Sequence, residues 1–270
     1  MGNKTAGHQE HRRQCYATIG NQRATVQAMA YFCLSGCPRL FPKGPLSVPT
    51  LSNTPVLPAT PALPTTWRVA AAAPGFRLRL GLVLVLLLGL LPVVPGFYHF
   101  VQARPGHPLP DPLLALLPVH DVSVPTFALI YGSIAATLVF LLPRPLLLLR
   151  ALWAYYFLQV LRIFTLWLLP LEPPADLLIL HDPVMDRIFE VTTQPIVRDL
   201  FFSGHTATMM LLLLAGRGPR WRLALALLTV AVGLLVLVQR VHYSYDVLAA
   251  PLFAWLAYWL AGRVCGRQDQ

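Results

Sequence analysis

The sequence predicts an all-α integral membrane protein with six transmembrane helices, on the basis of its composition, the length of its apolar stretches and the position of its charges. Hydrophobic residues make up 56% of the 270-residue chain and charged residues only 12%. Soluble proteins average about 25% charged residues, so much of this surface must face lipid. The spanning segments should be helices, because an open strand cannot satisfy its backbone hydrogen bonds in a bilayer.

Six apolar stretches follow one another from residue 78 onward. They cover about residues 78–101, 124–142, 146–170, 200–215, 221–239 and 243–261. Most approach the ~20 residues that a helix needs to cross the hydrocarbon core. Pro92 and Pro95 are expected to kink or end the first stretch, and the short fourth one can begin in the polar residues before Leu200. The sequence therefore predicts a six-span membrane domain over 78–262, followed by a short cytoplasmic tail at 263–270.

Residues 1–70 have a different composition and predict a disordered N-terminal tail. From Pro45 to Pro64, prolines alternate with Ser, Thr and small apolar residues, which favours an unfolded or polyproline-like chain. Cys33 and Cys37 lie close together, but no second pair of ligands follows at zinc spacing. We expect no metal site in the tail.

The charges between the apolar stretches alternate in sign and predict the orientation. Basic residues gather on one set of flanks: Arg68, Arg77, Arg79, Arg144, Arg217, Arg220, Arg222, Arg263 and Arg267. The first and third connections are more acidic, with Asp111, Asp121, Glu172, Asp176, Asp182, Asp186, Glu190 and Asp199 against Arg104, Arg187 and Arg198. The short fifth connection, with Arg240, is the exception. The positive-inside rule then places both termini in the cytoplasm and explains the net charge of +10 without nucleic-acid binding.

Two histidine motifs lie at the edges of apolar stretches, on the side predicted to be non-cytoplasmic. Ser203-Gly204-His205-Thr206 opens the fourth stretch, and His242-Tyr243-Ser244-Tyr245-Asp246 opens the sixth. Ionisable groups at membrane depth are energetically unfavourable, so they suggest a function by default. Both motifs enter the membrane from the same side, and the sequence therefore predicts one site there.

His242 and Asp246 are four residues apart and should share a helix face. An aspartate in this position can fix the tautomer of an imidazole and stabilise its charged form. A carboxylate at the edge of an apolar helix also needs a partner to offset its desolvation. Tyr243 and Tyr245 have the character of interface anchors.

The first motif allows two interpretations. Gly204 lets the backbone approach a ligand closely, and the free amides of a helix N-terminus favour a phosphate. Alternatively, Ser203 or Thr206 caps the helix and the histidine is merely interfacial.

Three further charged residues are candidates for ligand binding. Arg162, within the third stretch, could bind a phosphate or pair with an acid from another helix. Arg198 and Asp199 precede the first motif and could contact the same ligand or belong to an ordinary solvated loop. The sequence leaves both questions open.

The segments from Asp199 to Thr206 and from His242 to Ala250 resemble the two signature motifs of the sphingomyelin synthases, which belong to the lipid phosphatase and phosphotransferase superfamily. Pro108-Leu109-Pro110-Asp111 resembles the family's Pro-rich motif, and Arg150 to Arg162 with Thr165 resembles its third-span motif. The similarity covers roughly residues 78–262.

The chain also departs from these families. It has Val197-Arg198 where the synthases have Cys-Gly, and Ser244 where they have threonine. The related phosphatases carry a Lys-x6-Arg-Pro motif, which is missing here, and an arginine at the position of Val236. These differences argue against a simple phosphatase and leave the transferred headgroup undefined.

The resemblance implies a phosphotransferase in which His242, oriented by Asp246, attacks the phosphorus of a phospholipid. His205 would protonate the departing diacylglycerol and then deprotonate ceramide or a similar lipid alcohol. The residues expected to bind substrate are Arg162, Arg198, Asp199, Ser203, Gly204 and Tyr243. The expected partners are the phospholipid donor, the ceramide-like acceptor and the bilayer, without metal or cofactor. A lipid phosphate phosphatase and a non-catalytic lipid-binding protein are the alternatives, and the oligomeric state stays open.

Overall fold

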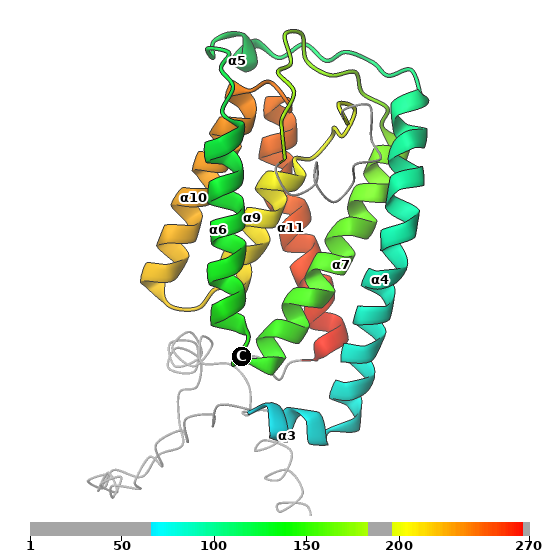
Figure 1. Ribbon diagram of the computed structural model, residues 1–270, viewed down its shortest axis with the longest axis vertical. Coiled ribbons are helices and arrows are strands. Elements are labelled where there is room, and N and C mark those ends of the chain that lie inside the picture. The colour runs from blue at the N-terminus through cyan, green and yellow to red at the C-terminus, as the bar shows by residue number, and fades with distance from the viewer. Residues whose placement is uncertain (1–65, 183–195, 267–270) are drawn as a thin grey trace, which may run out of the picture. The chain divides into compact units, whose positions relative to one another are not determined.

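The computed structural model describes residues 66–182 and 196–266 and forms a bundle of α-helices over these ranges (Figure 1). The helices are α3 (Trp67–Ala72), α4 (Pro74–Ala103), α5 (Pro112–Ala115), α6 (Ser123–Leu141), α7 (Pro145–Leu168), α9 (Gly204–Ala215), α10 (Pro219–Val238) and α11 (Ser244–Cys265). Within the described residues there is no strand, only an isolated bridge between His107 and Leu171. The prediction of an all-helical fold is therefore confirmed.

Five of these helices are long and apolar enough to cross a membrane, namely α4, α6, α7, α10 and α11. Such a set of apolar helices suggests a multi-pass membrane protein. The large side chains on the outer faces of α4 and α10 are exposed, as a lipid-facing surface requires: Leu78, Leu82, Val85, Leu88, Leu223, Leu227, Val230 and Leu234.

The fourth predicted span is shorter than expected. It corresponds to α9, whose 12 residues rise about 18 Å, whereas the hydrocarbon core is about 30 Å thick. The preceding residues Leu200 and Phe202 are apolar and buried but not helical. Phe201 between them has a φ of 89°, a conformation that interrupts a helix. The fourth predicted span, and with it the count of six, is thus not confirmed, although α9 is a short apolar helix.

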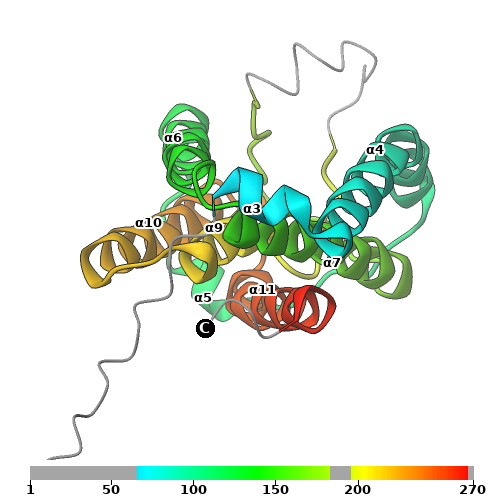
Figure 2. The ribbon, with the colours of Figure 1, turned by 90° about the horizontal axis from the view of Figure 1, so that it is seen from below.

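Helix α9 occupies the middle of the bundle and contacts α6, α7, α10 and α11 (Figure 2). Helix α11 also packs along α7, with the small residues Ala250, Ala254, Ala257 and Ala261 fully buried on one face. Small residues let helix backbones approach closely, which is a common way of packing helices in membranes. The central position of α9 brings the residues at its N-terminus into contact with several helices at once.

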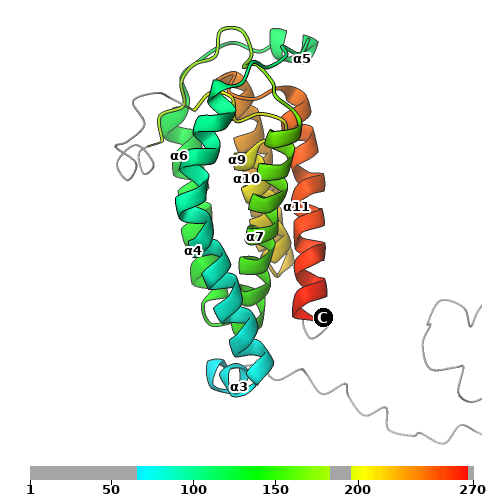
Figure 3. The same cartoon turned by 90° about the vertical axis from the view of Figure 1, so that its right-hand side faces the viewer.

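The two ends of the bundle differ in charge. One end carries α5 and the connections before α6, α9 and α11, and the other carries α3, the connections after α6 and α9, and the end of α11 (Figures 1 and 3). We call them the α5 end and the α3 end. Hydrogen bonds from Trp67 Nε1 to Leu142 O (2.6 Å) and from Arg79 Nη1 to Cys265 O (3.0 Å) join elements at the α3 end. The described acidic residues of the first and third connections lie at the α5 end together with Arg104, Arg198 and Arg240. The arginines before α4, in the connections after α6 and α9, and at the end of α11 lie at the α3 end.

The predicted N-terminal tail falls mostly on residues 1–65, which lie outside the described ranges. Its last residues belong to α3, which begins at Trp67. At the other terminus α11 continues to Cys265, into the segment predicted as the cytoplasmic tail, and residues 267–270 again lie outside the described ranges.

Candidate active site

The two histidine motifs meet at the α5 end of the bundle. The rings of His205 and His242 have centroids 5.9 Å apart and are inclined by 64°. A backbone hydrogen bond from Ser203 N to Asp246 O (3.1 Å) joins the motifs directly. Two segments that are distant in the sequence thus place their imidazoles side by side.

Asp246 holds the imidazole of His242 and the start of α11 together. Its Oδ2 atom lies 3.3 Å from His242 Nδ1 and also accepts a hydrogen bond from the backbone N–H of Tyr243 (3.1 Å). Tyr243 is the N-cap of α11, so the second bond belongs to the helix cap. When Nδ1–H donates to the carboxylate, Nε2 keeps its lone pair and can act as a nucleophile. Both side chains are buried, with 2% and 1% of the residue surface exposed for His242 and Asp246.

His205 is the second residue of α9 and lies between an aromatic ring and the other histidine. Phe127 of α6 contacts its ring edge-on, with centroids 5.8 Å apart. Its Nδ1 atom is buried and has no hydrogen-bond partner among the described residues. Buried polar groups are nearly always paired, so this nitrogen is suited to a proton or a ligand atom from outside the chain.

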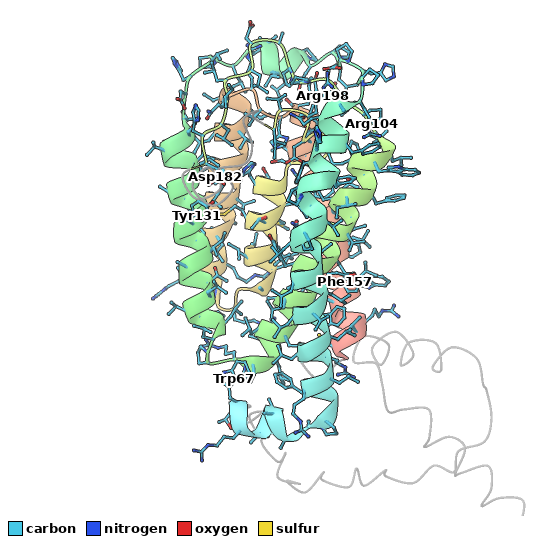
Figure 4. All side chains as sticks on the ribbon, turned by 45° about the vertical axis from the view of Figure 1, so that its right-hand side comes forward. Trp67, Arg104, Tyr131, Phe157, Asp182 and Arg198 are labelled. Carbon is cyan, nitrogen blue, oxygen red and sulfur yellow. The ribbon has the colours of Figure 1, made fainter. Side chains whose placement is uncertain are left out.

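A pocket lies along the start of α6 and includes Phe127 in its lining. It has a volume of about 590 Å³ and its lining is mainly apolar. Phe127 and Tyr131 of α6 contribute to the lining, and the Tyr131 hydroxyl donates to the Asp182 carboxylate (2.7 Å). These two residues lie beside each other in Figure 4. Phe127 thus belongs to the lining of this pocket and also contacts His205.

Arg162 of α7 brings a positive charge to the first motif. Its guanidinium donates to Phe202 O (2.7 Å), forms an ion pair with Asp199 and lies 3.5 Å from the hydroxyl of Tyr98, which donates to Asp199 (3.3 Å). The sequence left open whether Arg162 pairs with an acid or binds phosphate, and the structure shows the acid. Three of its five N–H groups donate to described residues, which leaves two without a partner among them.

Gly204 allows this guanidinium to lie against the N-terminus of α9. A Cβ atom at position 204 would lie 2.6 Å from both Cζ and Nη1 of Arg162, which is closer than atoms can approach. The sequence predicted a close approach of this backbone to a ligand. In the structure its close neighbour is the Arg162 side chain, and the contact of Gly204 with a ligand stays a prediction. A cation and the positive end of a helix dipole together favour an anion at this place.

Ser203 has the capping role that the sequence offered as an alternative. Its buried Oγ accepts hydrogen bonds from the Thr206 N–H (3.3 Å) and the Thr206 hydroxyl (3.1 Å). The expected contact of Ser203 with substrate stays a prediction.

Arg198 lies in a clamp between connections at the α5 end, where Figure 4 shows it beside Arg104. Its Nε and Nη2 atoms donate to the Glu172 carboxylate, and Nη1 donates to the carbonyls of Gln102 and Arg104 (2.6 Å each). The hydrogen bond from the Gly106 N–H lowers the pKa of Glu172, and the charge of Arg198 lowers it further. Together they outweigh the small increase that desolvation causes. All three guanidinium nitrogens of Arg198 donate hydrogen bonds within the protein. Its contact with a ligand stays a prediction.

Tyr243 faces the same clamp. Its hydroxyl donates to Glu172 O (3.0 Å) and accepts a hydrogen bond from Leu109 N (3.2 Å). Its side chain is buried among the connections, which differs from an anchor at a lipid interface. The predicted contact of Tyr243 with substrate is likewise not tested.

Sequence reasoning missed Tyr98 and Phe127, and it singled out Asp111 only through the resemblance. Tyr98 and Phe127 come from α4 and α6, far from either motif in the chain. No local spacing indicates such neighbours, since their contacts depend on how the helices pack.

Part of the chain matches a known protein family. Residues 198–263 match the family model described as PAP2 superfamily C-terminal, a segment that contains both histidine motifs. No curated protein and no solved structure matches the chain. Members of this superfamily are typically phosphatases and phosphotransferases. The match supports a place for this chain in the phosphatidic acid phosphatase-like superfamily.

Proposed function

We propose that the protein is a membrane lipid phosphotransferase, similar to the sphingomyelin synthases. It moves a phospho-headgroup from a glycerophospholipid to ceramide or a similar lipid alcohol through a phosphohistidine. The observation that carries the proposal is the pairing of His205 with His242, with Asp246 behind the second imidazole. The superfamily match suggests lipid phosphatase or phosphotransferase activity in general, and the geometry supports this particular chemistry.

In the first half-reaction, Nε2 of His242 attacks the phosphorus of the donor lipid. The bond between phosphorus and the diacylglycerol oxygen breaks as the N–P bond forms, and protonated His205 gives its proton to the departing oxygen. Asp246 accepts the Nδ1–H of His242 and stabilises the positive charge that develops on that imidazole.

In the second half-reaction, neutral His205 acts as the base. It removes the proton from the primary hydroxyl of the acceptor lipid while that oxygen attacks the phosphohistidine. The N–P bond breaks, His242 regains its lone pair, and His205 is protonated for the next cycle. Both half-reactions need the two imidazoles to reach one phosphorus atom, which the 5.9 Å separation of their centroids permits.

Arg162 and the start of α9 supply the charge that a phosphoryl group needs. The guanidinium lies against Gly204, next to His205, with two N–H groups not used by described residues. Preorganised donors of this kind stabilise the negative charge that develops on phosphoryl oxygens. In our proposal Asp199 holds the guanidinium in place, and the ligand contacts Arg162.

The charge asymmetry supports a non-cytoplasmic position for the site. The arginines at the α3 end would face the cytoplasm, together with both termini, and the histidines at the α5 end would then face the lumen, periplasm or exterior. In this arrangement α9 and the extended residues before it form the fourth of six membrane crossings.

The test is a headgroup transfer assay in washed membranes containing the protein. Fluorescent ceramide and mixed phospholipids are supplied, and the products are identified by mass spectrometry. We expect a new phosphosphingolipid and diacylglycerol from the wild type and their loss in His242→Gln, His205→Gln and Asp246→Asn. His120→Gln, which removes an exposed histidine at the same end, is the matched control and should keep its activity.

The other outcomes decide between the alternatives. Release of phosphate without any new phospholipid indicates a phosphatase that uses water as the acceptor. Turnover that survives in His242→Gln contradicts the mechanism. The absence of turnover with every lipid offered favours a non-catalytic lipid-binding protein.

A further inference from the structure

The connection between α4 and α6 is joined to the turn that carries the proposed nucleophile. Residues 109–111 of this connection contact residues 243–245, which are the three residues between His242 and Asp246. The outer contacts are hydrogen bonds from Leu109 N to Tyr243 Oη (3.2 Å) and from Tyr245 Oη to Pro110 O (3.4 Å). The central contact is made by Asp111.

Asp111 binds the first residue of α11 with both carboxylate oxygens. Oδ2 accepts the backbone N–H of Ser244 (2.6 Å), and Oδ1 accepts the Ser244 hydroxyl (3.1 Å) and the N–H of Leu114 (3.0 Å). The first N–H groups of a helix have no partner within the helix. Asp111 therefore satisfies an unpaired N–H of α11 and also serves as the N-cap of α5.

The charge of Asp111 suits this position. A carboxylate at a helix N-terminus interacts favourably with the helix dipole. Partial burial raises the pKa of Asp111, but the N–H groups of Ser244 and Leu114 outweigh this and lower it below its ordinary value. Asp111 is thus ionised when the contact to α11 is made.

The bonds from Ser244 to Asp111 affect the neighbouring contact between His242 and Asp246. His242 precedes α11 and Asp246 lies in its first turn, so their 3.3 Å contact depends on the conformation of the residues between them. Asp246 Oδ2 also accepts the backbone N–H of Tyr243. If the turn loosened, the carboxylate could keep this backbone bond and lose its contact with the imidazole. First turns of helices fray easily. A neutral imidazole released from the carboxylate can then carry its proton on either nitrogen.

We propose that Asp111 is a positioning residue for His242. It fixes the turn from Tyr243 to Tyr245, so that Asp246 keeps the imidazole in the Nδ1–H tautomer with Nε2 free. Asp111 touches neither imidazole and acts through Ser244. The tautomer can be observed in the resting protein, whereas the effect on turnover rests on the proposed function.

The first readout is the nitrogen chemical shifts of His242 in ¹⁵N-histidine-labelled protein in detergent micelles, assigned by comparison with His242→Gln. We expect the Nδ1–H tautomer in the wild type and a mixture in Asp111→Asn and Asp111→Ala. An asparagine amide accepts on one side only, so one of the two backbone N–H groups loses its partner. Ser244→Ala removes only the hydroxyl contact and should shift the tautomer less.

The second readout is the kinetics of headgroup transfer. We expect kcat of Asp111→Asn to fall by about ten- to a hundredfold, with little change in KM, because displacing a reacting group has effects of this size. Asp121→Asn is the matched control. Asp121 also accepts bonds from a backbone N–H and a hydroxyl at a helix start, those of Ser123 (3.0 and 2.7 Å), and its further bond comes from Gln239 and not from the turn after His242.

The outcomes separate this proposal from the proposed function. If Asp111→Asn keeps the wild-type nitrogen shifts and loses no more kcat than Asp121→Asn, the positioning role is wrong. If the shifts change but the wild type transfers no headgroup, the positioning role holds and the proposed function fails. If Asp111→Ala does not fold, Asp111→Asn decides, because asparagine is itself a good N-cap.

Discussion

At the residue scale, the site depends on how closely a cation approaches a helix backbone. The guanidinium of Arg162 lies against Gly204, held from behind by Asp199 and Phe202 O. A single methyl group would disturb this arrangement. Replacing Gly204 by alanine therefore tests whether the site requires the space that the missing Cβ leaves for Arg162.

We expect Gly204→Ala to reduce headgroup transfer about a hundredfold, because the new Cβ forces Arg162 away from its position. Alanine improves helix propensity by about 1 kcal/mol, so stability should fall less than activity. The control is Gly262→Ala, whose Cβ would lie 2.9 Å from Nη2 of Arg150, an arginine of α7 away from the histidines. Transfer rates and thermal unfolding of both variants are the measurements. Equal losses of activity in the two variants would contradict a special role for Gly204.

The sequence predicted the neighbourhoods within each motif better than the contacts between distant segments. The spacing of His242 and Asp246 predicted one helix face. The structure places the two side chains in contact, but His242 precedes α11, so the contact spans the N-cap of the helix and not one of its faces. Arg198 is different: it lies next to Asp199 in the chain, yet its guanidinium binds Glu172 and the end of α4. The side chains of adjacent residues in an extended segment point to opposite sides, and the sequence does not indicate which residues each side chain contacts.

At the element scale, hydropathy predicted the five long helices and failed at the start of α9. Residues 200–202 are as apolar as a helix would be and two of them are buried, but Phe201 has a positive φ. Nothing in the sequence indicates a left-handed phenylalanine. Ser203, a common helix cap, was the available signal for the true start of α9, and the length expected of a transmembrane helix obscured it.

The connections at the α5 end form a second element-scale feature, since Glu172 and Arg198 clamp them together. The pKa of Glu172 is lowered in the folded protein below its ordinary value of 4.5. A lowered pKa means that the carboxylate stabilises the fold above the unfolded pKa, and that this contribution disappears as the pH falls through the folded pKa. The clamp should therefore open in acid.

We expect amide hydrogen exchange of residues 104–109 to rise relative to intrinsic rates when the pH falls from 7 to below about 4, the ordinary range of a glutamate. Glu172→Gln should show raised exchange already at pH 7 and little further change, because it carries no titrating charge. The Glu172 side chain is only partly buried, with 30% of its surface exposed, so the effect should remain local to the connections. The same pH dependence in wild type and variant would assign the change to other acids.

At the scale of the whole molecule, the alternation of charge along the sequence becomes a difference between the two ends of one bundle. This follows from the alternating direction of successive long helices, which returns every second connection to the same end (Figures 1 and 3). The sequence could therefore predict that both histidine motifs share an end, although it could not predict the 5.9 Å between their rings. That distance depends on the packing of α9 among four other helices.

The orientation of the bundle in the membrane is the prediction that belongs to this scale. In a chain whose native cysteines are changed to serine, Pro143→Cys reports on the α3 end and Leu116→Cys on the α5 end, and both positions are exposed. In sealed vesicles with the cytoplasmic side inside, we expect a membrane-impermeant maleimide to label Leu116→Cys directly and Pro143→Cys only after permeabilisation, because the arginines at the α3 end favour the cytoplasm. Reversed labelling would place the histidines on the cytoplasmic face. Labelling of both cysteines from one side would contradict the crossing of α6 between them.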